Sequence, residues 1–406
     1  MTARCLSLGG SSEGLCTLKF LCSLAEGGHQ VHCLTAEDPG PLFAGRQHGF
    51  AEALSRIDFE PVSLGTPRRT PWGTGKAVAA FNIFTGTNPA DRVGVAAWEN
   101  ALREAHARFR PDYWYIRGAG QDFSPHMAAR RVARGTPWVA HFHDPWPVSI
   151  MPDPYAAGQG WRSAIVELRA RKIVESATVV TVPHSQLGEW MADRLDVDLG
   201  RFRAVPHIGY VEAWFGSIPP ASLPSRPTLA HAGFLSRQRS PVALLRAMRR
   251  CIDDGLDVVF QQTGPIDVKL QRDPSFVRAI DMLRERDATE ISSSRVSYHD
   301  ATRRMVEASA ALILSPGRPS SPFFPAKLAD AVSLRIPMIG LAPSHSVVQE
   351  ALGSWGGNVA PLDDEPAVET TLRRFLVEGS KPTPQALVDW VSPKSVAHSI
   401  DELPVG

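Results

Sequence analysis

The chain has 406 residues, 43% of them hydrophobic, and a formal net charge of +1. This length predicts two large domains, and the near-neutral charge argues against a protein that binds nucleic acid in bulk. No run of about 18 apolar residues occurs, and the first residues lack the apolar core of a signal peptide, so we expect a cytoplasmic protein. Five scattered cysteines without a C-x-x-C pair predict neither a zinc site nor a disulfide framework.

The N-terminal segment predicts a strand at Arg4–Leu8, a glycine-rich turn and then a helix. The turn contains Gly10, Ser11 and Ser12. Glycines let the backbone approach a ligand closely, and the start of a helix favours anions, so these residues are candidates for ligand contact. The pattern is not G-x-G-x-x-G, which disfavours a nicotinamide cofactor. A tight strand-to-helix turn without a ligand is the alternative.

Short apolar strands alternate with helical patterns through the rest of this half. Strands are expected at 30–35, 113–116, 138–142, 178–182 and 203–206, with helices at 91–109, 125–133, 161–176 and 186–195. Residues 37–90 are rich in loops. Within them, the stretch from Arg68 to Phe84 mixes basic, aromatic and apolar residues, which suits either peripheral contact with an anionic membrane or a surface loop with a half-buried helix.

The strand at 138–142 ends in His143 and Asp144. Ligands of open α/β sheets bind at the carboxyl ends of the strands, so both side chains are candidate site residues. A histidine that is hydrogen-bonded to a backbone carbonyl is the structural alternative.

The C-terminal half follows a proline-rich segment at 213–227, which predicts a linker. Strands are expected at 228–232, 258–263, 295–298, 311–314 and 338–341, and helices at 347–352, 366–376 and 384–403. After the first of these strands come Gly233, Arg237 and Arg239. The glycine permits close approach, and the two arginines can bind a diphosphate through charge-assisted hydrogen bonds. Gly264 ends the next strand.

The stretch from Ser320 to Leu341 predicts a loop, a buried helix and a buried strand. Pro325 suits the first helical position, and Pro337 ends the helix. Lys327 and Asp330 interrupt an otherwise apolar helix. The free N–H groups at the helix start suit a phosphate, and Asp330 can accept hydrogen bonds from a sugar hydroxyl. In an ordinary αβ unit both charges would face water.

This stretch resembles the C-terminal signature of retaining GT-B glycosyltransferases of the family 4 type. In that family the second of two acids, eight residues apart, holds the nucleotide ribose, and Asp330 takes its place. The first acid, which contacts the donor sugar, is replaced by Pro322. Arg335 stands where the family has glycine at the helix end; in a left-handed conformation it would cost roughly 1 kcal/mol.

The resemblance implies roles for further residues. Gly233, Arg237 and Arg239 resemble the family's diphosphate site, Gly264 its turn near the base, and His143 the histidine that faces the donor sugar. The remaining residues placed at the donor are Gly10, Phe324, Lys327 and Leu328. Ser11, Ser12 and Asp144 are placed on the acceptor side.

The predicted architecture is two Rossmann-like doubly wound domains that face each other across a cleft. They are an acceptor-side domain at 1–212, the linker at 213–227, a donor domain at 228–383 and a terminal helix at 384–406 that returns to the first domain. The predicted function is transfer of a hexosyl or related group from a nucleotide-diphospho-sugar to a glycan, lipid-linked or small-molecule hydroxyl, with retention and without a metal. A non-catalytic binding or scaffold subunit and a sugar-nucleotide epimerase of the same fold are the alternatives.

Overall fold

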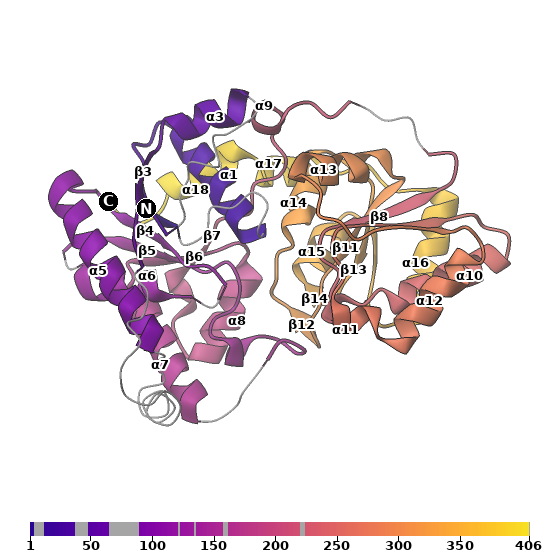
Figure 1. Cartoon of the computed structure of the whole chain (residues 1–406), viewed down its shortest axis with the longest axis horizontal. Coiled ribbons are helices and arrows are strands. Elements are labelled where there is room, and N and C mark those ends of the chain that lie inside the picture. The colour runs from indigo at the N-terminus through magenta and orange to yellow at the C-terminus, as the bar shows by residue number, and fades with distance from the viewer. Residues whose placement is uncertain are drawn as a thin grey trace. The chain divides into compact units, whose positions relative to one another are not determined.

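The computed structural model describes residues 1–3, 12–36, 48–64, 89–120, 122–133, 135–156, 161–219 and 224–405. They form two compact units (Figure 1). Unit 1 comprises Met1–Met151, Ala156–Pro206 and Val396–Gly406, and unit 2 comprises Pro152–Tyr155 and His207–Ser395.

Unit 1 is built on a seven-stranded parallel sheet in the order β3-β2-β1-β4-β5-β6-β7. The strands are β1 (Thr2–Ala3), β2 (His32–Thr35), β3 (Asp58–Pro61), β4 (Trp114–Arg117), β5 (Trp138–His141), β6 (Val179–Val182) and β7 (Phe202–Ala204). The strand order reverses between β1 and β4, so the carboxyl ends of these two strands mark the position where such sheets bind ligands.

Helices cover both faces of this sheet, as the alternating sequence pattern predicts. They are α1 (Ser12–Glu26), α3 (His48–Ser55), α5 (Pro89–Phe109), α6 (Ser124–Val132), α7 (Trp161–Ser176), α8 (Ser185–Leu195) and the C-terminal α18 (Pro393–Asp401), with single 3₁₀ turns η1 (Val148–Ile150) and η2 (Leu199–Arg201). Val396 and Ile400 of α18 are buried, and His29 Nε2 lies 3.2 Å from Asp401 Oδ1. The last helix therefore packs on the N-terminal domain, beside α1 (Figure 1).

Unit 2 contains a six-stranded parallel sheet in the order β10-β9-β8-β11-β13-β15. Its strands are β8 (Thr228–Ala232), β9 (Val259–Thr263), β10 (Thr289–Ser292), β11 (Ala310–Leu314), β13 (Met338–Leu341) and β15 (Asn358–Ala360), and a two-stranded ribbon joins β12 (Ser320–Ser321) to β14 (His345–Ser346). The helices are α9 (Glu212–Phe215), η3 (Arg237–Arg239), α10 (Val242–Asp253), α11 (Val268–Gln271), α12 (Pro274–Arg284), α13 (Tyr298–Glu307), α14 (Ala326–Ser333), α15 (Val347–Gly353), α16 (Glu365–Glu378) and α17 (Gln385–Trp390).

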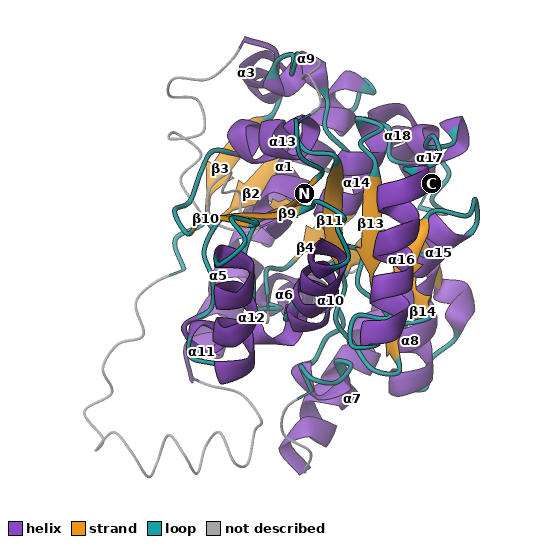
Figure 2. Cartoon of the chain, turned by 90° about the vertical axis from the view of Figure 1, so that its right-hand side faces the viewer, coloured by secondary structure: helices purple, strands orange, loops and turns teal. Residues whose placement is uncertain are grey.

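The central strand β11 shows why the sequence AALIL forms a strand buried on both faces. Leu312 and Leu314 pack into the core under α10, α12 and α16, which lie together in Figures 1 and 2. Ala311 and Ile313 point to the other core, which contains α14 and α15. Side chains alternate along a strand, so a continuous apolar run supplies both layers. The expected α/β class with two doubly wound sheets is confirmed.

Several predicted elements differ from the structure. The strand expected at 295–298 is wrong: the strand is β10, and Tyr298 begins α13, where Ser297 Oγ accepts a hydrogen bond from Asp300 N at 3.0 Å. The helix expected at 384–403 is two helices, because α17 ends at Trp390 and Pro393 starts α18. The sequence pattern also missed α3, β3, β12, β14 and β15. Residues 4–11, which contain the whole of the first strand expected at 4–8, lie outside the described residues.

The unit boundaries also fall at different residues from those expected. The chain enters unit 2 at His207, before the proline-rich segment at 213–227, and returns to unit 1 at Val396. Pro152–Tyr155 joins unit 2, where Arg318 N donates a hydrogen bond to Asp153 O at 3.1 Å. None of the described helices combines the length and the apolarity that crossing a bilayer requires.

Candidate functional site

The switch in strand order of unit 2 lies between β8 and β11. Gly233 follows β8, Gly264 follows β9, and Ser315 follows β11. Loops after neighbouring parallel strands meet at one edge of a sheet, and this edge is where open α/β sheets bind ligands.

The turns at Gly233 and Gly264 are in close contact at this edge. Gly264 has φ +118°, and a Cβ atom there would lie 2.7 Å from the carbonyl oxygen of Gly233. Gly233 has φ +130°, and its Cβ atom would lie 3.2 Å from Lys327 Nζ. Both positions favour glycine for the backbone conformation, and Gly264 needs it for the space as well, whereas a side chain at Gly233 would displace the Lys327 amine. The predicted residues Gly233, Gly264 and Lys327 are brought together.

The Lys327 amine is hydrogen-bonded to one of a pair of buried polar side chains that the sequence pattern did not indicate. Lys327 Nζ lies 2.8 Å from His231 Nε2, and His231 Nδ1 lies 2.7 Å from Gln262 Oε1. His231 and Gln262 are cross-strand neighbours in β8 and β9, and they are 1% and 0% exposed. Each stands two residues before its glycine, which is the one sequence signal that could have revealed them.

Positive charge gathers at this edge. Burial, together with the nearby Arg239 guanidinium, lowers the pKa of Lys327 from 10.5 to about 7. Arg239 is half-buried, and its Nε atom has no hydrogen-bond partner among the described residues. Arg237 is exposed. In the part of the chain that the structure describes, Arg237, Arg239 and Lys327 form no ion pair with a carboxylate, so an anionic ligand would be strongly favoured here.

Asp330 lies one turn further along α14, and its residue is 4% exposed. Tyr298 Oη donates a hydrogen bond to Asp330 Oδ1 at 2.7 Å. The Tyr298 ring lies 4.9 Å from the ring of Phe215 and 5.7 Å from that of Tyr210. Asp330 is therefore a buried acceptor beside an aromatic cluster, and neither it nor Lys327 is simply a solvated surface charge.

Other residues expected at the donor have packing roles in the structure. Phe324 is 5% exposed, and its ring stacks on His207 at 5.0 Å and on Trp390 at 5.1 Å. Leu328 is fully buried in the core around α14. Any contact of these two residues with a ligand would therefore come from the backbone. Pro322 is buried, and next to it Ser321 Oγ and Ser315 Oγ are hydrogen-bonded at 2.9 Å, so hydroxyl groups stand near the missing carboxylate.

In unit 1, His143 and Asp144 lie just after β5 and are half-buried. Ser12 begins α1 and is exposed, and the adjacent Glu13 Oε2 accepts a hydrogen bond from Gly120 N at 2.8 Å, which ties the start of α1 to the loop after β4. Gly10 and Ser11 lie outside the described residues, as does the Arg68 to Phe84 stretch with its expected membrane contact.

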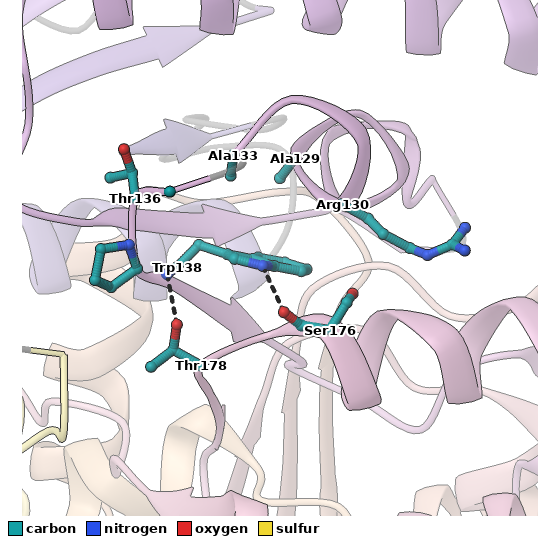
Figure 3. A pocket seen from close by; sticks show the side chains of 9 residues that line it. Ala129, Arg130, Ala133, Thr136, Trp138, Ser176 and Thr178 are labelled. Carbon is teal, nitrogen blue, oxygen red and sulfur yellow. Dashed lines mark hydrogen bonds between the residues drawn. The ribbon is translucent and has the colours of Figure 1, made fainter.

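A pocket of about 420 Å³ in unit 1 lies at the other end of its sheet (Figure 3). It surrounds Trp138, the first residue of β5. Trp138 N donates to Thr178 Oγ1 at 3.0 Å, and Trp138 Nε1 donates to Ser176 O at 2.9 Å (Figure 3). Because it is at the amino-terminal edge of the strands and its indole N–H is already paired, we do not assign the ligand site to it.

One family model matches part of the chain. Residues 14–207 match the family model described as "Glycosyl transferase 4-like domain". A search of curated protein sequences gives no significant match.

Solved structures match over nearly the whole chain. Sucrose-phosphate synthase from Thermosynechococcus elongatus has a TM-score of 0.67 at 14% identity, covering 99% of this chain and 96% of that one. Anabaena HepE in complex with UDP and glucose has a TM-score of 0.63 at 13% identity, covering 99% and 97%. An α,α-trehalose-phosphate synthase (UDP-forming) from Burkholderia vietnamiensis has a TM-score of 0.57 at 12% identity, covering 100% and 93%. Residues 14–207 thus match a glycosyl transferase 4-like domain, and the chain as a whole has the GT-B fold of these glycosyltransferases.

Proposed function

We propose that this protein transfers a sugar from a nucleotide-diphospho-sugar to an acceptor hydroxyl, with the donor bound at the edge of unit 2 formed by the loops after β8 and β9 and the start of α14. The observation that carries the proposal is the gathering of Lys327 and Arg239 beside two glycine turns, without an ion-paired carboxylate among the described residues. Such a site favours a compact anion that touches the backbone, as a diphosphate does.

The same residues supply what the reaction needs. When the glycosidic bond to phosphate breaks, negative charge develops on the leaving diphosphate, and preorganised cations stabilise that charge. Lys327 and Arg239 do this from inside the site, and Arg237 from the exposed side of η3. Positive side chains thus serve the leaving group without a metal. Asp330 accepts hydrogen bonds from the ribose, and the transfer proceeds with retention of configuration.

A uridine nucleotide is the first donor to test, because HepE is solved in complexes with UDP and with UDP-glucose. His143 and Asp144 are assigned to the sugar and the acceptor, respectively. The acceptor is a hydroxyl group of a glycan, of a lipid-linked compound or of a small molecule.

A non-catalytic nucleotide-sugar-binding subunit is the second candidate. It is favoured by Pro322, a buried residue without a polar side chain where the resembling enzymes carry the carboxylate that contacts the donor sugar. Such a protein would bind the donor and release no nucleotide. An epimerase would instead change the free nucleotide-sugar in the absence of an acceptor.

The test is thermal stabilisation by UDP, GDP, TDP, ADP and CMP and by their common sugar conjugates. A ligand at 100 times its dissociation constant adds about 2.7 kcal/mol of stability. We expect a selective shift that Arg237→Ala and Asp330→Ala abolish, and that the control Arg272→Ala, another exposed arginine of unit 2, leaves intact. No shift across the panel would contradict the donor site. Release of nucleotide from the selected donor then separates the transferase from the binding subunit.

A further inference from the structure

Hydrogen bonds link the side chains of Gln262, His231 and Lys327, and the donor and acceptor of each bond can be assigned. Gln262 Nε2 donates to Gly233 O at 2.9 Å and to Gly264 O at 3.1 Å. Its Oε1 therefore faces His231 Nδ1 as an acceptor, at 2.7 Å. His231 must carry its proton on Nδ1, which leaves Nε2 as an acceptor for the Lys327 amine at 2.8 Å.

The surroundings keep His231 neutral. Burial, the Lys327 amine and the Arg239 guanidinium together hold the pKa of His231 well below 6.5. These two cations come from α14 and η3, and Asp330 is the charged group on the next turn of α14 that also acts on Lys327. A neutral imidazole with this tautomer accepts from the lysine at neutral pH and cannot donate to it.

One amide group thus fixes three parts of the site. Gln262 binds the carbonyl groups of both glycine turns, and through His231 it sets the position of the lysine that lies against the first turn. A lysine side chain has four rotatable bonds and loses much freedom when a ligand immobilises it. Holding it in place before binding reduces that loss.

We propose that His231 and Gln262 are positioning residues that hold the Lys327 ammonium group beside the Gly233 turn, aimed at the diphosphate of the donor. The inference rests on the proposed function of this edge. It assigns a role to two buried polar side chains that would otherwise only fill the interior of the sheet.

The test is a double-mutant cycle read by calorimetric binding of UDP at pH 6.5. Lys327→Met removes the amine, and His231→Phe and Gln262→Met remove the two supports. We expect each support variant to weaken UDP binding about tenfold, the scale of one hydrogen bond to a charged group. In the Lys327→Met background His231→Phe should alter UDP binding by less than about twofold, because it acts through the lysine, whereas Gln262→Met should keep only the part of its loss that comes from the two glycine turns.

Two controls separate positioning from general damage. Gln261→Met changes the neighbouring glutamine of β9, whose amide binds Glu290 at the surface, and should leave UDP binding unchanged. His231→Gln keeps an oxygen near the place of Nε2 and should recover part of the affinity. Equal losses in the wild-type and Lys327→Met backgrounds, or no loss at all, would overturn the role of His231 and Gln262.

If the proposed function is wrong, the wild-type protein itself will bind no nucleotide, which distinguishes this outcome from a failure of the positioning role alone. The positioning role is still read in the ligand-free protein, from the pH dependence of Lys327 acetylation measured by mass spectrometry. We expect the midpoint near 7 to rise in His231→Phe, since the released amine reaches water and reacts as an ordinary lysine. An unchanged midpoint, or a lowered one from an amine that stays in place, would refute the positioning role.

Discussion

A side chain at Gly233 would meet the Lys327 amine, since its Cβ atom would lie 3.2 Å from Nζ. We therefore expect Gly233→Ala to displace the amine and to weaken UDP binding at least fivefold, about 1 kcal/mol, in addition to straining a backbone with φ +130°. Calorimetry with UDP measures the effect.

The matched control for strain is Gly255→Ala. Gly255 has φ +88° in the turn after α10, and a Cβ atom there meets nothing within 4 Å. It should lower the stability by about 1 kcal/mol and leave UDP binding unchanged. Equal losses of UDP affinity in both variants would show that Gly233 acts only through backbone strain.

Lys327 should destabilise the fold in a pH-dependent way. Its folded pKa of about 7 lies below the 10.5 of a free lysine, so between these values the unfolded chain binds more protons. Stability from this group therefore rises with pH through that window, and the penalty for the buried charge is fully present below pH 7. We expect Lys327→Met to raise Tm most at pH 6 and least at pH 10.

The difference between variant and wild type isolates this lysine, because both proteins share the neutral His231, whose own titration lowers stability at acid pH. A Tm difference that stays constant from pH 6 to 10 would contradict the depressed pKa. Ligand must be absent from these measurements, since a bound anion favours the charged form.

The same pKa predicts how donor binding depends on pH. An anion beside Lys327 raises its pKa, so the complex holds more protons than the free protein once the pH exceeds about 7. Binding of UDP-glucose should be tightest below pH 7 and weaken between pH 7 and 9. A nucleotide-sugar is the right probe because its diphosphate has no terminal phosphate that titrates. The pH dependence should vanish in Lys327→Met, and its persistence there would exclude this lysine as the cause.

The sequence predicts an element well when neighbouring residues mark both of its ends, and poorly when the element depends on contacts with distant segments. The β8 strand at Thr228–Ala232 was predicted with its observed bounds, because an apolar run between Pro227 and Gly233 marks both ends locally. The β10 strand was missed, since Thr289–Ser292 is a half-exposed edge strand without an apolar run. A strand was expected instead at residues 295–298, which contain Ser297, the N-cap residue of α13.

The candidate site divides in the same way. Glycines, arginines and the lysine of α14 can be recognised as motifs within one segment. The contact between His231 and Gln262 depends on the pairing of two parallel strands, and the stacking of Phe324 on Trp390 depends on the docking of α17 beside α14. No local pattern encodes either contact.

Tyr298 should orient Asp330 for the ribose. Its hydroxyl group donates to Asp330 Oδ1 at 2.7 Å, so Tyr298→Phe leaves that oxygen without this donor. We expect UDP binding to weaken about fivefold and binding of inorganic pyrophosphate, which has no ribose, to stay unchanged. Tyr210→Phe is the control, since its hydroxyl group donates to Gly216 O and the two rings are 5.7 Å apart. Equal weakening of UDP and pyrophosphate would contradict the assignment.

Arg335 lies two residues after Ser333, the last residue of α14, and has φ +54°, a left-handed conformation that glycine adopts without strain. The strain costs roughly 1 kcal/mol, and hydrogen bonds from Arg335 Nη1 to Thr383 O at 3.0 Å and from Nη2 to Gln385 Oε1 offset it. Arg335→Gly loses both bonds and the strain together, so its stability should stay near that of the wild type. Arg335→Ala loses both bonds and keeps the strain, so it should be less stable than the glycine variant by about 1 kcal/mol. Urea unfolding of the two variants checks this, and equal stabilities would show that the position carries no backbone strain.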